Sequence, residues 1–265
     1  MTVMLYQVDA FTGKPFKGNP AAVCLLDAPR PDGWMQALAA EMNLSETAFL
    51  LLESDRPSWN LRWFTPATEV DLCGHATLAS ARVLFERQPE LRSEDLVFQT
   101  RSGELRARWV NEAVELDFPV MNPESLEVES DLTDILGFQP VAAAYNGSYF
   151  LFEAADAAAV RAAEPDFIAL AESQTPEVII TAQSDRGDFD FISRFFAPQL
   201  GIDEDPVTGS AHCLLTPYWA ARLEKTEMSA YQASARGGVL QVRLDGDRVR
   251  IAGEAVIIFK TELLV

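Results

Sequence analysis

The sequence predicts an α+β protein built from two similar halves. A five-residue stretch, Arg62-Trp63-Phe64-Thr65-Pro66, reappears as Arg194-Phe195-Phe196-Ala197-Pro198. Each half also shows the same order of patterns: short apolar strands, a helical stretch, the repeated stretch, a second helix and a β-hairpin. Self-similarity at this scale indicates a duplicated folding unit, so we expect two α+β domains that are related to each other.

The length and composition agree with two modest globular domains. The chain has 265 residues, 48% of them hydrophobic, which is enough for sizeable cores. Proline, asparagine, serine and glutamate replace the periodic apolar residues at 119–131, so we expect a linker there between domains 1–120 and 131–265. Aspartate and glutamate number 40 against 21 lysines and arginines, and this net charge of −19 makes a nucleic-acid partner unexpected.

The expected strands correspond between the halves. Short strands are expected at 3–9, 21–26, 141–145 and 149–153. Residues 104–118 form a hairpin that turns at Asn111-Glu112. Its counterpart, 238–259, turns at Asp245-Gly246-Asp247, where an Asp-Gly pair suits the positive φ angles of a tight turn.

Each half is expected to carry a helix after its first strands. Apolar residues recur on one helical face from Trp34 to Met42, and Asp32 is the expected N-cap. The corresponding stretch of the second half is 157–171, and we expect it to break at Pro165.

Each copy of the repeat leads through an acidic loop to a turn of small residues. The turns, Gly74-His75-Ala76 and Gly209-Ser210-Ala211, open helices expected over 78–85 and 214–219, and Pro217 should kink or end the second one. A helix N-terminus presents unpaired N–H groups and a positive dipole end, so the two turns together would bind a carboxylate or phosphate. Equivalent loops of two facing halves would lie on either side of one cleft. For either turn alone, close packing of the helix on a strand is the alternative explanation.

Two carboxylates are candidates for acid–base chemistry. Glu46 lies between a helix and an apolar strand, where burial would raise its pKa toward neutrality; a solvated glutamate at a strand end is the alternative. Asp205 ends the acidic run that precedes Gly209. The separation from Arg194 to Gly209 is 15 residues, whereas that from Arg62 to Gly74 is 12, which indicates a loop lengthened for a purpose rather than a plain charged loop.

Cysteines and histidines are too few for most metal or disulfide sites. Cys24, Cys73 and Cys213 are widely spaced, and the chain has two histidines, so neither a disulfide framework nor a His-rich metal site is expected. Cys73 directly precedes Gly74, where the helix N-terminus would favour a thiolate, and a nucleophilic cysteine is therefore the competing mechanism.

The chain also lacks the signatures of other classes. It shows no apolar run of about 18 residues, no P-loop and no G-x-G-x-x-G fingerprint, and the pattern of its first residues leads us to expect no signal peptide. We therefore expect a cytoplasmic protein with no membrane partner, metal, nucleotide or other cofactor.

Six motifs stand in order along essentially the whole chain. They are Asp9-Ala10-Phe11, Gly18-Asn19-Pro20-Ala21-Ala22-Val23, Ser45-Glu46-Thr47-Ala48-Phe49, Arg62-Trp63-Phe64-Thr65-Pro66, the stretch 69–77 and the stretch 204–212. Together they resemble the phenazine-biosynthesis PhzF-like isomerase family, which shares its fold with diaminopimelate epimerase. The resemblance implies two pseudo-symmetric domains, each a mostly antiparallel sheet curled around a central helix, and a homodimer.

The resemblance further implies a cofactor-independent isomerase with its active site between the domains. A glutamate corresponding to Glu46 moves a proton between carbons of a small cyclic amino or hydroxy carboxylate. Residues matching His75, Asp205 and Ser210 hold or polarise that substrate in the family. The turns at Gly74 and Gly209 bind its carboxylate.

Related epimerases use a pair of cysteines instead. Cys73 matches the first of these, but Pro206 stands in the place of the second, so a two-thiol mechanism is disfavoured. A thiol-dependent racemase or epimerase, and a non-catalytic protein that binds small carboxylates, remain the alternatives.

Overall fold

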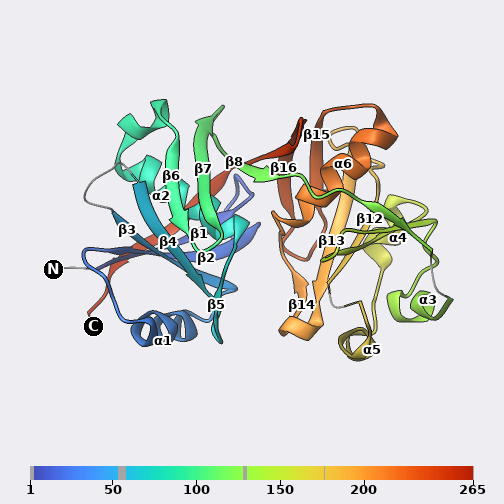
Figure 1. Ribbon diagram of the computed structural model, residues 1–265, viewed down its shortest axis with the longest axis horizontal. Coiled ribbons are helices and arrows are strands. Elements are labelled where there is room, and N and C mark those ends of the chain that lie inside the picture. The colour runs from blue at the N-terminus through green and yellow to red at the C-terminus, as the bar shows by residue number, and fades with distance from the viewer. Residues whose placement is uncertain (1–2, 53–57, 128–129, 176, 265) are drawn as a thin grey trace. The chain divides into compact units, whose positions relative to one another are not determined.

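The computed structural model describes residues 3–52, 58–127, 130–175 and 177–264. The chain divides into two compact units (Figure 1). Unit 1 comprises Met1–Phe118 and Ile251–Val265, and unit 2 comprises Pro119–Arg250. Among the helices of the described ranges, none is both long and apolar enough to cross a membrane.

Unit 1 is a mostly antiparallel sheet with a buried helix. Its strands are β1 (Met4–Ala10), β2 (Asn19–Leu26), β3 (Glu46–Leu52), β4 (Ser58–Phe64), β5 (Glu69–Val70), β6 (Leu96–Thr100), β7 (Gly103–Val110), β8 (Ala113–Pro119) and β18 (Ala255–Glu262). Its helices are α1 (Asp32–Met42), α2 (Gly74–Arg87) and the 3₁₀ helix η1 (Pro89–Ser93). β2 pairs in parallel with β3 and β4 with β6, whereas the pairs β1–β2, β1–β18, β3–β4, β6–β7 and β7–β8 are antiparallel.

The helix α2 is the centre of unit 1. Its residues from Gly74 to Phe85 are buried, with the exception of Arg82, because small and apolar side chains surround its whole circumference. Thr77 and Ser80 lie inside this core and donate their hydroxyl protons to the carbonyls of Cys73 and Ala76, so these polar groups are buried with partners. The helix predicted at 78–85 is confirmed and begins one turn earlier.

Unit 2 contains nine further strands and five helices among its described residues. The strands are β9 (Glu124–Leu126), β10 (Ala142–Tyr145), β11 (Phe150–Glu153), β12 (Val178–Gln183), β13 (Phe191–Ala197), β14 (Ile202–Asp205), β15 (Glu227–Gln232), β16 (Gly238–Asp245) and β17 (Arg248–Gly253), whose last residues belong to unit 1. The helices are α3 (Ser130–Leu136), α4 (Ala157–Ala162), α5 (Phe167–Glu172), α6 (Ala211–Leu223) and the 3₁₀ helix η2 (Pro198–Leu200).

Pro217 was predicted to kink or end its helix, and it does not end α6. The helix runs from Ala211 to Leu223 and contains the proline. A proline has no N–H, so the Cys213 carbonyl four residues earlier loses its usual partner. The backbone N–H of Met121 donates to that carbonyl at 3.1 Å instead. The helix continues because a neighbouring segment of unit 2 supplies the missing hydrogen bond.

The second half does not extend from 131 to 265 as predicted. β18 pairs antiparallel with β1 over seven residue pairs, from Met4 opposite Glu262 to Ala10 opposite Ala255. The chain therefore returns to unit 1 at Ile251, and unit 2 already begins at Pro119. Within the expected linker, β9 pairs with β10 and is part of the sheet of unit 2; residues 128–129 lie outside the described ranges.

Several local predictions are confirmed and one is wrong. The helical stretch 157–171 is broken around Pro165, into α4 and α5. The first hairpin turns at Asn111-Glu112, where both residues have positive φ angles of 49° and 65°. Asp32 is the first residue of α1 and not its N-cap, which is Pro31. Its carboxylate accepts a hydrogen bond from Arg62 at 2.8 Å, because that guanidinium is a stronger partner than a backbone N–H.

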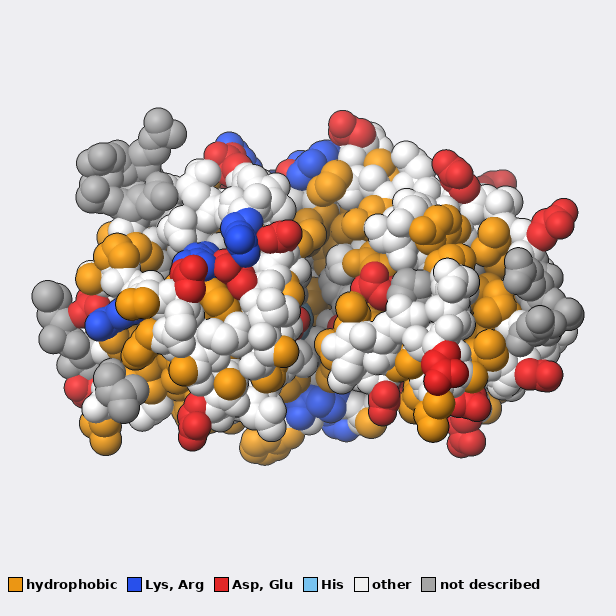
Figure 2. All heavy atoms as spheres, turned by 60° about the horizontal axis from the view of Figure 1, so that its bottom comes forward, with side chains coloured by type: hydrophobic (Ala, Val, Ile, Leu, Met, Phe, Trp, Pro, Cys, Tyr) orange, Lys and Arg blue, Asp and Glu red, His pale blue; other side chains and the backbone are white. Residues whose placement is uncertain are grey.

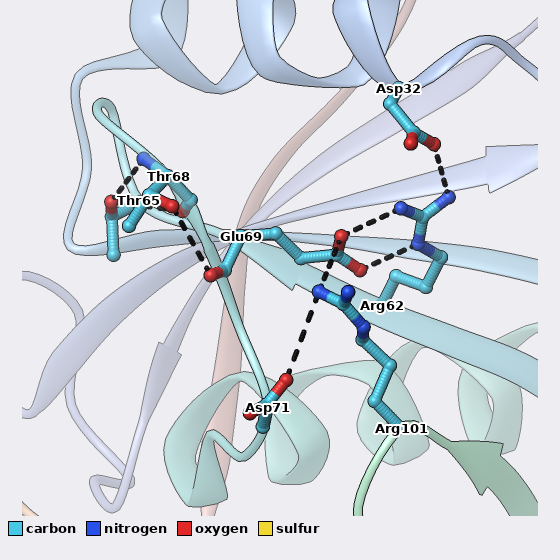
Figure 3. A network of polar contacts seen from close by, with 7 residues as sticks. All are labelled: Asp32, Arg62, Thr65, Thr68, Glu69, Asp71 and Arg101. Atoms are coloured by element: carbon cyan, nitrogen blue, oxygen red, sulfur yellow. Dashed lines mark hydrogen bonds and ion pairs between the residues drawn. The ribbon is translucent and has the colours of Figure 1, made fainter.

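The repeated five-residue stretch has the same structural role in both units. Arg62 binds Glu69 of the adjoining strand through two hydrogen bonds of 2.7 Å (Figure 3). Its guanidinium lies 5.1 Å from the ring centre of Phe64. In unit 2, the corresponding Arg194 binds Glu204 at 2.7 and 3.0 Å and lies 4.8 Å from the ring of Phe196. Each arginine thus fastens a strand to the short strand that follows it, which explains why the stretch recurs.

Candidate active site

Three elements of unit 1 begin at the candidate site. β2 starts at Asn19, β3 starts at Glu46, and α2 starts at Gly74, directly before His75. The parallel pairing of β2 with β3 sets Ala21 opposite Glu46, so both strands start at the same edge. The fold therefore brings together residues from three separate motifs of the sequence.

His75 connects the side chains of this site. Its Nε2 lies 3.2 Å from Glu46 Oε2, and its Nδ1 lies 3.3 Å from Asn19 Nδ2 and 3.5 Å from Cys73 Sγ. The Glu46 contact is within reach but is not aligned as a linear hydrogen bond, as is common in catalytic groups before a substrate binds. The imidazole of His75 thus lies close to both candidate catalysts predicted from the sequence, the Glu46 carboxylate and the Cys73 thiol.

Burial decides the charge of this imidazole. The His75 side chain is 6% exposed and that of Glu46 is 14% exposed. Because burial penalises the charged imidazolium, the pKa of His75 is lowered to about 3. The ring is therefore neutral near pH 7, carries one N–H, and can donate one hydrogen bond while it accepts another.

The carboxylate, thiol and imidazole are also ligand types for a metal ion. Their nearest ligand atoms, from Glu46, Cys73 and His75, lie within 4.8 Å of one another. However, Glu46 approaches Nε2 and Cys73 approaches Nδ1, and the lone pairs of these two ring nitrogens diverge. Because the two groups approach different ring nitrogens, the arrangement favours separate hydrogen bonds to the ring over joint coordination of one metal ion.

The start of α2 is suited to binding an anion. Its N-cap residue, Cys73, has extended backbone and makes no side-chain capping hydrogen bond. The N–H groups of the first turn are thus not used by a capping side chain, and they lie beside Glu46 and His75. This geometry supports the expected binding of a carboxylate at Gly74, which remains a prediction.

In unit 2, Asp205 belongs to a buried polar cluster. Its side chain accepts a hydrogen bond of 2.5 Å from the Thr208 hydroxyl. Gln232 completes the cluster, because its amide nitrogen donates to the Asp205 carbonyl at 2.9 Å and its amide oxygen accepts from the Thr208 N–H at 2.9 Å. These contacts hold the segment that leads into Gly209 in one conformation.

Ser210 is held by a tyrosine. The Tyr149 hydroxyl donates to Ser210 Oγ at 2.8 Å, and burial raises the pKa of Tyr149 to about 12, so the phenol stays protonated. Since this oxygen accepts from Tyr149, the hydroxyl proton of Ser210 is directed elsewhere. Ser210 is thereby oriented as a donor, in keeping with its predicted role toward a substrate.

The structure brings some of the predicted site residues together and leaves others in a separate unit. Glu46, Gly74 and His75 form one group in unit 1, whereas Asp205, Gly209 and Ser210 belong to unit 2. Their roles toward a substrate remain predictions. Sequence reasoning missed Asn19, Tyr149 and Gln232 as supporting residues. For Asn19, its place in the motif Gly18-Asn19-Pro20 was a signal; the other two carry no distinctive pattern.

The fold and the site define a class of protein. Two units of strands and helices make this an α+β protein with an epimerase-like fold, and unit 1 carries a carboxylate–imidazole pair at the start of its central helix. A family model described as "Phenazine biosynthesis-like protein" matches residues 8–261. The chain belongs to this family, also known by the name PhzF, and is an isomerase of it.

Individual relatives agree with this assignment. An uncharacterized isomerase of Halalkalibacterium halodurans is 49% identical over 266 residues, which cover 100% of both chains. The crystal structure of a PhzF-family phenazine biosynthesis protein from Enterococcus faecalis superposes with a TM-score of 0.95 at 44% identity, over 100% of both chains. A predicted epimerase from Pseudomonas aeruginosa, with 22% identity, a TM-score of 0.75 and 99% coverage of both chains, shares the fold. The predicted diaminopimelate epimerase-like fold class is confirmed.

Proposed function

We propose that this isomerase needs no cofactor and that Glu46 moves a proton between carbons of a small cyclic amino or hydroxy carboxylate. One observation carries the proposal: a largely buried carboxylate lies 3.2 Å from a neutral, buried imidazole at the start of a helix. A carboxylate in such surroundings is suited to both take and return a proton. Family membership supports the reaction class, and the substrate class is our inference.

The reaction needs a base, a stabilised anion and an acid in succession. The Glu46 carboxylate removes a proton from a carbon of the substrate, and the electron pair left behind spreads over the adjoining π-system. The N–H groups at the start of α2 stabilise the negative charge that the substrate carboxylate then carries. Glu46, now protonated, returns the proton to a different carbon of the same π-system. The product is an isomer, so atoms and electrons balance without an oxidant or reductant.

The test compares three proteins on one isomerised carboxylate. Glu46→Gln keeps the shape of the side chain and removes the base, so its turnover should fall by about 10²- to 10⁴-fold while the carboxylate still binds. In deuterated water, the wild-type product should contain deuterium at the carbon that receives the proton, to the extent that the carboxyl proton of Glu46 exchanges with solvent before it is returned. Undiminished turnover by Glu46→Gln would exclude Glu46 as the base.

The thiol mechanism is the second candidate, and one contact favours it. Cys73 Sγ lies 3.5 Å from His75 Nδ1, and an imidazole can take a proton from a thiol. Under our proposal, Cys73→Ala loses at most about tenfold in rate, a smaller loss than that for a missing acid–base group. A dead Cys73→Ala beside an active Glu46→Gln would assign the chemistry to the thiol.

A binding protein without catalysis predicts a third pattern. Small carboxylates would then raise the melting temperature of both the wild type and Glu46→Gln, because a ligand selective for the native state stabilises it. No isomer or deuterium exchange would accompany binding. The same three proteins therefore distinguish all three functions.

A further inference from the structure

We propose that Asn19 is a positioning residue that fixes the neutral tautomer of His75, with the proton on Nε2 facing Glu46. Asn19 is fully buried at the start of β2, and its Nδ2 lies 3.3 Å from His75 Nδ1. An amide nitrogen only donates, so the facing ring nitrogen must accept. The single ring proton is then on Nε2, opposite a carboxylate oxygen that only accepts.

With the Asn19 amide oriented as in the structure, the other tautomer would be mismatched at both ring nitrogens. A proton on Nδ1 would meet the amide hydrogens of Asn19, and the bare Nε2 would face the lone pairs of the Glu46 carboxylate. Both faults would lie in a buried site, where water cannot relieve them. The Cys73 thiol approaches Nδ1 from 3.5 Å and, as a donor, favours the same assignment.

The backbone before Asn19 is built for this approach. Gly18 has a φ angle of +65°, a conformation that side chains disfavour. A Cβ at Gly18 would also lie 2.1 Å from the Ala10 carbonyl oxygen and 2.8 Å from Thr12 Cγ2. A residue other than glycine would displace the start of β2, and with it the amide that faces His75.

The tautomer bears on the choice between the two mechanisms, and this consequence rests on the proposed function. An Nε2–H that faces Glu46 stabilises its carboxylate form, which is the form that acts as a base. The Asn19 amide also competes with the Cys73 thiol for the single lone pair of Nδ1, which the thiol would need to lose its proton to the ring. Asn19 therefore directs the single imidazole toward the carboxylate and away from the thiol.

The chain offers an internal reference for measuring the tautomer. His212, the second of its two histidines, has Nδ1 2.9 Å from the carbonyl oxygen of Thr208. A carbonyl only accepts, so His212 carries its proton on Nδ1, the opposite arrangement. Two histidines with opposite tautomers should give two distinct patterns in a nitrogen–proton correlation spectrum of the ¹⁵N-labelled protein, without any substrate.

The first experiment records that spectrum near pH 7 for the wild type and for His75→Asn, which identifies the His75 signals by their loss. We expect His75 protonated on Nε2 alone and His212 on Nδ1 alone. A wild-type His75 protonated on Nδ1, or on both nitrogens, would overturn the proposal. Because this reading uses the unaltered protein, it does not depend on the stability of any Asn19 variant.

Two substitutions then test whether Asn19 is the cause. The carboxylate of Asn19→Asp has almost the same shape but only accepts, so a proton should appear on Nδ1 of His75 while His212 keeps its pattern. In Asn19→Ala, the preference of the His75 proton for Nε2 should weaken. Its control is Asn60→Ala, a change in the middle of β4, which should leave the tautomers of both histidines unaltered. An unchanged His75 pattern in a folded Asn19→Asp protein contradicts the proposal.

Kinetics separate this inference from the proposed function. On an isomerised carboxylate, Asn19→Ala should lower kcat by about 10- to 100-fold, as is typical when the partner that orients a functional histidine is removed, with KM little changed. If the tautomer is as expected but Glu46→Gln isomerises normally, the proposed function fails and the role of Asn19 toward His75 stands. If Glu46 is essential but His75 carries its proton on Nδ1, the proposed function stands and the role of Asn19 toward His75 fails.

Discussion

At the scale of single residues, the buried histidines link structure to pH. Burial lowers the pKa of His75 to about 3 and that of His212 to about 4, from the usual 6.5. In the unfolded chain, both rings bind protons as the pH falls below 6.5, whereas in the folded protein they do not until the pH is much lower. The unfolded state therefore binds more protons in this window, and the stability of the fold must decrease as the pH falls.

A denaturation series should show this dependence. Between pH 6.5 and about pH 4, each histidine should remove about 1.4 kcal/mol of unfolding free energy per pH unit. His75→Asn removes one of these two contributions, so its stability should fall less steeply with acid than that of the wild type. Urea unfolding at a series of pH values measures both slopes. Equal slopes would mean that His75 is not held neutral by burial.

The residue scale also shows where sequence reasoning stops. Glu46 and His75 were both predicted from motifs, but their contact was not, because 29 positions separate them in the chain. The contact depends on the parallel pairing of β2 and β3 and on the start of α2, which are long-range features. Asn19 belongs to a motif that the sequence analysis identified, but the contact of its amide with His75 Nδ1 is visible only in the structure.

At the scale of elements, the duplication could be recognised in the sequence because corresponding arginines of the two units make equivalent contacts. The Arg62–Glu69 and Arg194–Glu204 pairs each join a strand to the next one, so the sequence kept an arginine and an aromatic residue two positions later. The interruption near Pro165 was predictable from the local chemistry of proline. The continuation of α6 through Pro217 was not, because the compensating N–H comes from Met121, almost 100 residues away in the chain.

The arginine pairs should contribute measurably to stability. Arg194 and Glu204 are only 13% and 20% exposed, so Arg194→Gln should lower the free energy of unfolding by about 2 kcal/mol through the loss of a charge-assisted bidentate pair. Arg161→Gln is the matched control, since Arg161 and Asp185 are 39% and 54% exposed, and its loss of stability should be clearly smaller because solvent screens the pair. Equal losses in urea unfolding would show that the repeated pair has no special role.

At the scale of the whole molecule, acidic residues outnumber basic ones by 40 to 21. On the face that Figure 2 shows, the acidic side chains are scattered and do not form one patch. With a net charge of −19, two copies of the chain repel each other at long range, and salt screens this repulsion. The homodimer that the family resemblance implies remains a prediction; sedimentation at low and high salt would test it, with stronger association expected at high salt.

The return of the chain to unit 1 leads to a truncation experiment. Deleting 251–265 removes β18 and leaves one edge of β1 without its seven paired residues. We expect unit 1 to lose protection from hydrogen exchange while unit 2, which is continuous in sequence, keeps it. Deleting only Leu264 and Val265 is the control, because β18 ends at Glu262. Equal protection of unit 1 in both truncated proteins would show that β18 is dispensable.

The same return reverses the order in which the two units are completed during synthesis. A ribosome releases β1 before unit 2, but β18, which pairs with the open edge of β1, emerges only after the whole of unit 2. At about 5–20 residues per second, β1 waits many seconds for β18, while all of unit 2 is made in the interval. The nascent chain thus carries an unpaired strand edge while unit 2 is made, the kind of edge that pairs with other chains. The half that is translated first is the half that is finished last.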